Sequence, residues 1–147
     1  MTTVNDLLKA KEQRVYSILP QTTLLQVVKT LGQYKVGALL VVDPQGKLIG
    51  IVSERDIVRK AQDGFSTIEK ITASEIMTKD IVVGVATDDM SYVMNIMTKN
   101  KIRHLPIMDG SKIIGVITIG DVVKAMLSEE KYENRMLRDY IEGKYPA

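Results

Sequence analysis

The sequence predicts an α/β protein with two copies of one β-α-β-β-α unit, related by a pseudo-two-fold axis, and a C-terminal helix. Two observations predict this fold. The phrase GIVSERD at residues 50–56 returns as GVITIGD at residues 115–121, an offset of 115 − 50 = 65 residues. The same order of apolar and polar stretches precedes both copies. The 147 residues suffice for one compact unit, or for two small domains fused into one.

Each copy begins with a short helix, which is followed by a short strand. The helix start is marked by a Thr with an acidic residue three positions later, as in Thr3 with Asp6 and Thr72 with Glu75. This spacing is the signature of a capping box. The next helix has apolar residues at i, i+3, i+4 and i+7. These are Leu24, Val27, Val28 and Leu31 in the first copy, and Met90, Val93, Met94 and Met97 in the second. The spacing predicts that the Met-rich stripe is core.

A hairpin and a closing helix complete each copy. Each of the segments 36–52 and 102–117 consists of two apolar runs joined by a polar Asp/Gly turn, and this pattern predicts a pair of strands in each segment. The closing helices begin with SERDIVRKA and TIGDVVKAM. We therefore place the first repeat at residues 3–63, the second at 72–128, and a charged helical tail at 129–147. The tail carries Met136, Leu137, Tyr140 and Ile141 on one side.

Composition narrows the classes of function. A net charge of +2, one Phe and no Trp leave neither a basic face nor a stacking platform for nucleic acid. The chain has no Cys and a single His, His104, so we expect no disulfide and no metal site. It has no GxxxxGK[ST] phosphate loop and no evident nucleophile beside a His, which argues against an enzyme acting on nucleotides. The segment MTTVNDLLKAKEQR is too charged for a signal peptide or membrane span, so we expect a cytoplasmic protein.

The repeated phrase has two interpretations. Ser53 and Thr118 stand where an N-cap belongs, with Asp56 and Asp121 three residues later. A capping box without any ligand is the commoner meaning of such a pattern. The alternative is a nucleotide site, because a helix N-terminus attracts phosphate and a carboxylate accepts hydrogen bonds from a ribose diol. The two roles are compatible, since one carboxylate has acceptor capacity for both.

The phrase G-h-h-[ST]-x-x-D (h, apolar), occurring twice at the end of such units, resembles a pair of CBS domains, or Bateman module. The residues that carry the resemblance are Gly50, Ser53, Asp56, Gly115, Thr118 and Asp121, with IRHLPIMD at 102–109 and SEIMTKD at 74–80. The chain is similar to stand-alone CBS-pair proteins of bacteria and mitochondria. The resemblance implies clefts between the repeats that bind AMP, ADP or ATP, and in some members NAD(H) or S-adenosylmethionine.

The resemblance also implies roles for single residues. The Asp would hold the ribose, and the Ser or Thr would lie near the phosphate. Residues of the other repeat would complete each cleft. For the Asp56 cleft these would be Val82, Ile102, Arg103 and His104, and for the Asp121 cleft Tyr16, Val36 and Gly37. Arg55, one residue before Asp56, is a further candidate for the phosphate.

The two clefts differ in expected charge. Arg103 and His104 stand where the first copy has Gly37 and Ala38. A guanidinium beside an imidazole suits a phosphate, although a surface Arg is usually only a solvated charge. The comparison of the repeats thus predicts that the Asp56 cleft holds the more highly charged phosphate.

The leading interpretation is a regulatory module that senses energy or redox state through an adenine nucleotide and signals by conformational change. The alternative is an accessory subunit or scaffold that regulates a partner enzyme without a ligand of its own. CBS pairs also occur as parts of enzymes such as IMP dehydrogenase, but a catalytic barrel does not fit in 147 residues. We expect a homodimer with no catalytic cofactor and no membrane contact. Apolar residues of the closing helices motivate the dimer, namely Ile57, Val58, Val122, Val123 and Met126.

Overall fold

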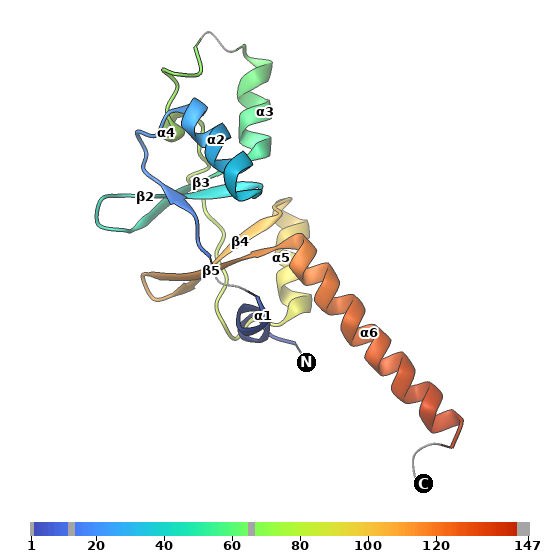
Figure 1. Cartoon of the computed structure of the whole chain (residues 1–147). Helices are drawn as coiled ribbons and strands as arrows, with labels where there is room; N and C mark the ends of the chain where they lie inside the picture. The colour runs from blue at the N-terminus through green and yellow to red at the C-terminus, as the bar shows by residue number, and fades with distance from the viewer. Residues whose placement is uncertain (1, 12–13, 65–66, 144–147) are drawn as a thin grey trace. The chain divides into compact units, whose positions relative to one another are not determined.

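The computed structural model describes residues 2–11, 14–64 and 67–143, and Figure 1 shows their helices and strands. The first repeat contributes α1 (Val4–Ala10), β1 (Ser17–Ile18), α2 (Leu24–Tyr34), β2 (Ala38–Val42), β3 (Leu48–Ser53) and α3 (Glu54–Gln62). The second contributes α4 (Ala73–Ile76), α5 (Met90–Asn100), β4 (His104–Asp109), β5 (Lys112–Thr118) and α6 (Ile119–Ile141). This is the predicted order of elements, with one strand missing from the second repeat.

The chain folds into two compact units that do not coincide with the two sequence repeats. One unit, here called the Asp56 unit, contains residues 14–83 and 110–114. The other, the Asp121 unit, contains the described residues of 1–13, 84–109 and 115–147. Helix α1 therefore belongs with the elements of the second repeat, and α4 with those of the first. The repeats have exchanged their first helices.

The Asp56 unit is built on a three-stranded sheet in the order β1-β2-β3. Strand β1 pairs parallel with β2, and β2 pairs antiparallel with β3 in a register that joins Ala38 to Ser53. The helix stripe predicted for α2 packs on this sheet through Leu24, Val27 and Leu31, whereas Val28 is exposed. Leu39, Leu40 and Val41 of β2 are buried, and Leu39 and Val41 join the α2 residues in this core.

The Asp121 unit contains the β4-β5 pair, α5, α1 and α6. Met90, Val93 and Met97 are buried along α5, which confirms that the Met-rich stripe is core. The short strand predicted before α5 is not formed by the described residues. A single parallel bridge between Gly84 and Ile107 replaces it. A Cβ atom at Gly84 would meet the Leu105 side chain at 2.9 Å, so the close approach requires a glycine, which is a weak strand former.

Helix α6 continues without interruption from the closing helix into the tail. Its 23 residues run from Ile119 to Ile141, where we expected two separate helical segments. Figure 1 shows α6 as the longest labelled helix, ending near the C-terminus. Its first turns supply Val122 to the core, and the later turns are largely exposed. Val122 is therefore not available for the dimer contact to which we assigned it.

Candidate functional site

The Asp56 motif forms where β3 passes into α3. The Ser53 backbone N–H donates to Asp56 Oδ2 at 2.8 Å, and the Asp56 N–H donates to Ser53 Oγ at 3.4 Å. These bonds complete the predicted capping box, which satisfies donors that a helix start leaves open. Asp56 is 7% exposed and is the only buried charged residue among those described.

The second carboxylate oxygen of Asp56 is also engaged. Thr78 Oγ1 donates to Asp56 Oδ1 at 3.1 Å, and the Arg59 guanidinium lies 3.6 Å from the same oxygen. Thr78 reaches this position because the segment after α4 pairs with β3, with Ile51 and Thr78 exchanging N–H···O bonds of 3.0 and 2.9 Å. The exchanged helix thus brings a hydroxyl to the repeated acid.

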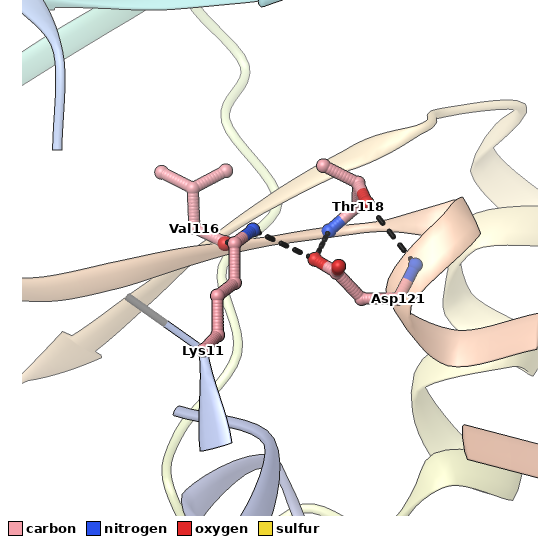
Figure 2. Close-up of polar contacts among 4 residues, drawn as sticks. All are labelled: Lys11, Val116, Thr118 and Asp121. Carbon is pink, nitrogen blue, oxygen red and sulfur yellow. Dashed lines mark hydrogen bonds and ion pairs between the residues drawn. The ribbon is translucent and has the colours of Figure 1, made fainter. Parts of the chain in front are cut away.

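The Asp121 motif is the counterpart at the passage from β5 to α6. The Thr118 N–H donates to Asp121 Oδ2 at 2.9 Å, and the Asp121 N–H donates to Thr118 Oγ1 at 3.1 Å. Figure 2 shows a further contact, in which the side chain of Lys11 reaches the same carboxylate. Lys11 Nζ lies 2.8 Å from Asp121 Oδ2 and donates to the Val116 carbonyl at 3.2 Å. Lys11 thus binds the same oxygen as the Thr118 N–H, whereas Thr78 binds the Asp56 oxygen that the Ser53 N–H does not use.

The carboxyl group of Asp121 is held in its charged form. Partial burial alone would raise its pKa, but hydrogen bonds from Lys11 and from the Thr118 N–H outweigh burial. The pKa of Asp121 therefore lies below its ordinary value of 3.8. The site is occupied by a carboxylate and a neighbouring ammonium at neutral pH.

The two repeated acids differ in accessibility. The side chain of Asp121 is 27% exposed, and that of Asp56 is 6% exposed. The hydrogen bonds from Lys11 Nζ and from the Thr118 N–H both end on Asp121 Oδ2, and none of the described residues donates to Oδ1. Asp121 Oδ1 can accept a further hydrogen bond more readily than Asp56 Oδ1, which already accepts from Thr78 and is less exposed.

Two backbone carbonyls mark where the hairpins meet these motifs. The Glu54 N–H donates to the Gly37 carbonyl at 3.0 Å, and the Ile119 N–H donates to the Arg103 carbonyl at 2.9 Å. In each unit the start of the hairpin lies beside the N-terminus of the helix that carries that unit's own Asp. Gly37 therefore shares a unit with Asp56, and Arg103 with Asp121. The assignment of Gly37 to the Asp121 cleft and of Arg103 to the Asp56 cleft stays a prediction.

The other candidates lie near these hairpin starts or in the segments before them. The Tyr16 ring stacks on that of Tyr34 with centroids 4.1 Å apart, and the Tyr16 carbonyl accepts from the Leu40 N–H. Val36 and Ile102 follow the C-caps of α2 and α5, and their N–H groups bond to Leu31 and Met97. Val82 and His104 are partly buried, and Arg55 is exposed on α3.

A capping box alone does not identify a ligand site in this molecule. The same box closes the start of α1, where the Thr3 N–H donates to Asp6 Oδ2 at 2.9 Å, and of α4, where Glu75 accepts from Thr72. Asp6 and Glu75 are exposed and do not follow a strand. What distinguishes the Asp56 and Asp121 boxes is the strand before them and the side chain that the exchanged helix delivers to the carboxylate.

Comparison with known proteins assigns the family. The model of the CBS domain matches residues 4–63 and 73–128, which together cover more than half of the chain. The chain belongs to the CBS-domain family. A mitochondrial CBS domain-containing protein of Arabidopsis thaliana is 34% identical over 152 residues, which cover 98% of this chain and 74% of that protein. The tandem pair predicted from the repeated phrase is thereby confirmed.

Solved structures agree in fold. A CBS-domain protein from Agrobacterium tumefaciens superposes with a TM-score of 0.82 at 34% identity, over 85% of this chain and 93% of that one. A CBS-domain protein from Burkholderia ambifaria gives a TM-score of 0.82 at 35% identity, over 86% and 95% of the two chains. The α/β fold with two CBS repeats and a C-terminal helix is confirmed.

Membership of the family sets the general class of function. CBS-pair proteins are generally regulatory modules that bind adenosyl ligands, and stand-alone members are regulatory rather than catalytic. The Arabidopsis relative is mitochondrial, so membership does not by itself assign this CBS pair to the cytoplasm. No helix among the described residues is long and apolar enough to cross a membrane. Within residues 2–11, 14–64 and 67–143, no three His, Asp or Glu side chains gather as metal ligands.

The repeat comparison missed Lys11 and Thr78, because both lie after the short first helices, where the two copies diverge. Lys11 and Asp121 are 121 − 11 = 110 residues apart, and no periodic pattern links them. The exchange of first helices, which brings them together, leaves no mark in a sequence read repeat by repeat. Lys11 places a positive charge beside Asp121 that the comparison of the repeats did not include.

Proposed function

We propose that this CBS pair is a regulatory module that binds an adenine nucleotide, such as AMP, ADP, ATP or NAD, at the Asp56 and Asp121 motifs and signals by conformational change. The observation that carries the proposal is the paired arrangement of Ser53 with Asp56 and Thr118 with Asp121, each at a strand-to-helix passage. In this arrangement a ribose diol would donate to the carboxylate, while the helix N-terminus faces the phosphate. We expect no catalysis and a cytoplasmic location.

The remaining candidates have roles that follow from the family resemblance. Arg55, Arg103 and His104 would lie near the phosphate. Tyr16, Val36, Gly37, Val82 and Ile102 would border the base. Val82, Ile102, Arg103 and His104 would serve the Asp56 cleft, and Tyr16, Val36 and Gly37 the Asp121 cleft.

Thermal unfolding with AMP, ADP, ATP and NAD at millimolar concentration tests the proposal on protein shown by native mass spectrometry to be ligand-free. A ligand at one hundred times its Kd stabilises the native state by about 2.7 kcal/mol, so at least one nucleotide should raise the Tm by several degrees. Asp121→Asn should reduce this shift. The asparagine keeps one acceptor oxygen for the Thr118 N–H but places an amide where Oδ1 would accept a hydroxyl.

Asp6→Asn is the matched control, because Asp6 occupies the same capping box in α1 outside the repeated phrase. It should leave the ligand-induced shift unchanged. The proposal fails when none of the four nucleotides raises the Tm of ligand-free wild-type protein.

One observation bears on the expected homodimer. The later turns of α6 expose large apolar side chains to solvent, including Tyr132, Leu137, Tyr140 and Ile141. Such residues in close sequence are typical of a helix that packs against another protein surface. We propose that these turns join two copies of the chain in a homodimer, and this contact is compatible with nucleotide binding.

A further inference from the structure

Lys11 has hydrogen-bonding capacity left over at the Asp121 motif. Its ammonium carries three donors, of which Asp121 Oδ2 takes one at 2.8 Å and the Val116 carbonyl takes another at 3.2 Å. The Lys11 side chain is 38% exposed, so the ammonium is also in contact with solvent. The bonds to the described residues thus leave one donor of Lys11 and the neighbouring Oδ1 acceptor of Asp121 available to a ligand.

The Asp56 motif lacks this arrangement. Its equivalent contact comes from the neutral hydroxyl of Thr78. The cation nearest to Asp56 in the described contacts is Arg59, 3.6 Å away with a side chain that is 72% exposed. Solvent screens such a charge, whereas Lys11 is hydrogen-bonded in place at its carboxylate. An anionic ligand therefore meets a neutralised carboxylate at Asp121 and a less well compensated one at Asp56.

The residue beside the helix start also differs between the two motifs. The Arg103 carbonyl accepts from the first N–H of α6, so the backbone of this arginine lies at the helix start. In the Asp56 unit the equivalent carbonyl belongs to Gly37, which has no charge. The N-terminus of a helix itself carries a partial positive charge.

We propose that Lys11 is a specificity-determining residue, which makes the Asp121 motif the site that prefers the more negatively charged adenine nucleotide, ATP over AMP. The proposal rests on the proposed function, and it reverses the charge order expected from the repeats. Lys11 neutralises the carboxylate that holds the ribose and directs its remaining donor toward a phosphate oxygen. The preference arises because each additional phosphate charge interacts with an ammonium fixed in position.

Calorimetric titration of AMP and ATP into wild type, Lys11→Met and Lys11→Arg tests this role. Lys11→Met keeps a long side chain and removes the charge, and it should weaken ATP binding about tenfold or more, the size of one charge-assisted contact. AMP should weaken by a clearly smaller factor. Lys11→Arg should retain most of the ATP preference. Lys9→Met is the control, because Lys9 is an exposed lysine in the last turn of α1.

The titrations separate this proposal from the proposed function. When wild type binds no adenine nucleotide, the proposed function fails and the role of Lys11 fails with it. When wild type binds but Asp121→Asn leaves ATP affinity unchanged, the nucleotide site stands elsewhere and the role of Lys11 is wrong. Equal losses of AMP and ATP in Lys11→Met, or no loss, also overturn it. Tighter binding in Lys11→Met would mean that Lys11 competes with the ligand, which is the opposite role. Thermal unfolding in the absence of ligand verifies that every variant is folded.

Discussion

The side chain of Met77 lies directly against the backbone of Gly50. A Cβ atom at position 50 would come within 2.9 Å of Met77 Cγ and 3.2 Å of Met77 Cβ. These atoms are close to the Met77 backbone, so the side chain cannot simply swing away. The glycine of the repeated phrase is therefore a packing requirement, since it lets the segment after α4 approach β3 and deliver Thr78 to Asp56.

Gly50→Ala should destabilise the native state by about 1–3 kcal/mol, because overpacking forces Met77 and the backbone near it to shift. Urea unfolding at neutral pH measures the change. Gly32→Ala is the matched control, since Gly32 lies in α2 with no atom within 4 Å of an added Cβ. It should be neutral or stabilising by up to about 1 kcal/mol, as expected for Gly to Ala in a helix. Equal effects of both changes would contradict the packing argument.

Asp56→Ala should cost more stability than Asp6→Ala, although both remove the acid of a capping box. The loss of a cap costs about 1 kcal/mol in either case. Asp56→Ala also leaves the partly buried Thr78 hydroxyl without its acceptor, which adds a cost of about 1–3 kcal/mol. Chemical unfolding of the two variants side by side gives the difference. A cost for Asp6→Ala equal to that of Asp56→Ala would show that the Thr78 contact contributes nothing.

The Lys11 and Asp121 ion pair should make stability depend on pH in the acid range. The folded-state pKa of Asp121 is lowered, so the contribution of the pair is fully present above the ordinary value of 3.8 and is lost as the pH falls through the lower folded pKa. Wild type should exceed Lys11→Met by up to about 1 kcal/mol at pH 7, and this advantage should vanish at strongly acid pH.

NMR titration of the carboxyl carbons is the direct measurement. The pKa of Asp121 should rise in Lys11→Met and stay unchanged in Lys9→Met. A constant difference in stability across the acid range would mean that Lys11 acts by packing and not by charge.

Leu137→Glu should prevent the proposed homodimer from forming, because it places a charge among the exposed apolar residues of α6. Light scattering should give twice the chain mass of 16.4 kDa for wild type and 16.4 kDa for the variant. Because Leu137 is exposed, the substitution should leave the core of each chain intact. Glu133→Gln serves as the control for a change on the same helix. A wild-type monomer at high concentration would refute the dimer.

Local signals made most elements predictable. Thr3, Ser53, Thr72 and Thr118 are each followed by an acid three positions later and each begin a helix, because this spacing satisfies open donors within four residues of chain. The apolar stripes of α2 and α5 were predictable for the same reason, since helical periodicity is local. The two hairpins followed from their Asp/Gly turns.

The parts that could not be predicted depend on contacts between distant segments. Gly84 forms one bridge where a strand was expected, because its contacts with Leu105 and Ile107 decide the geometry. Thr78 follows its partner Asp56 by 78 − 56 = 22 residues, and Lys11 precedes its partner Asp121 by 121 − 11 = 110 residues. The exchange of first helices, and not the repeated phrase, determines which residue contacts each acid.

The exchange of first helices has a consequence for biosynthesis. The Val4 N–H bonds to the Asp88 carbonyl and the Asn5 N–H to the Ala86 carbonyl, so α1 docks on residues that are translated more than eighty positions after it. A seven-residue helix has little stability alone, and α1 must wait in an unstructured state until translation has passed its docking segment. A nascent chain halted between the repeats would contain Lys11 but not yet its partner Asp121. Deletion of residues 1–11 would therefore damage the Asp121 unit, which otherwise consists of elements of the second repeat.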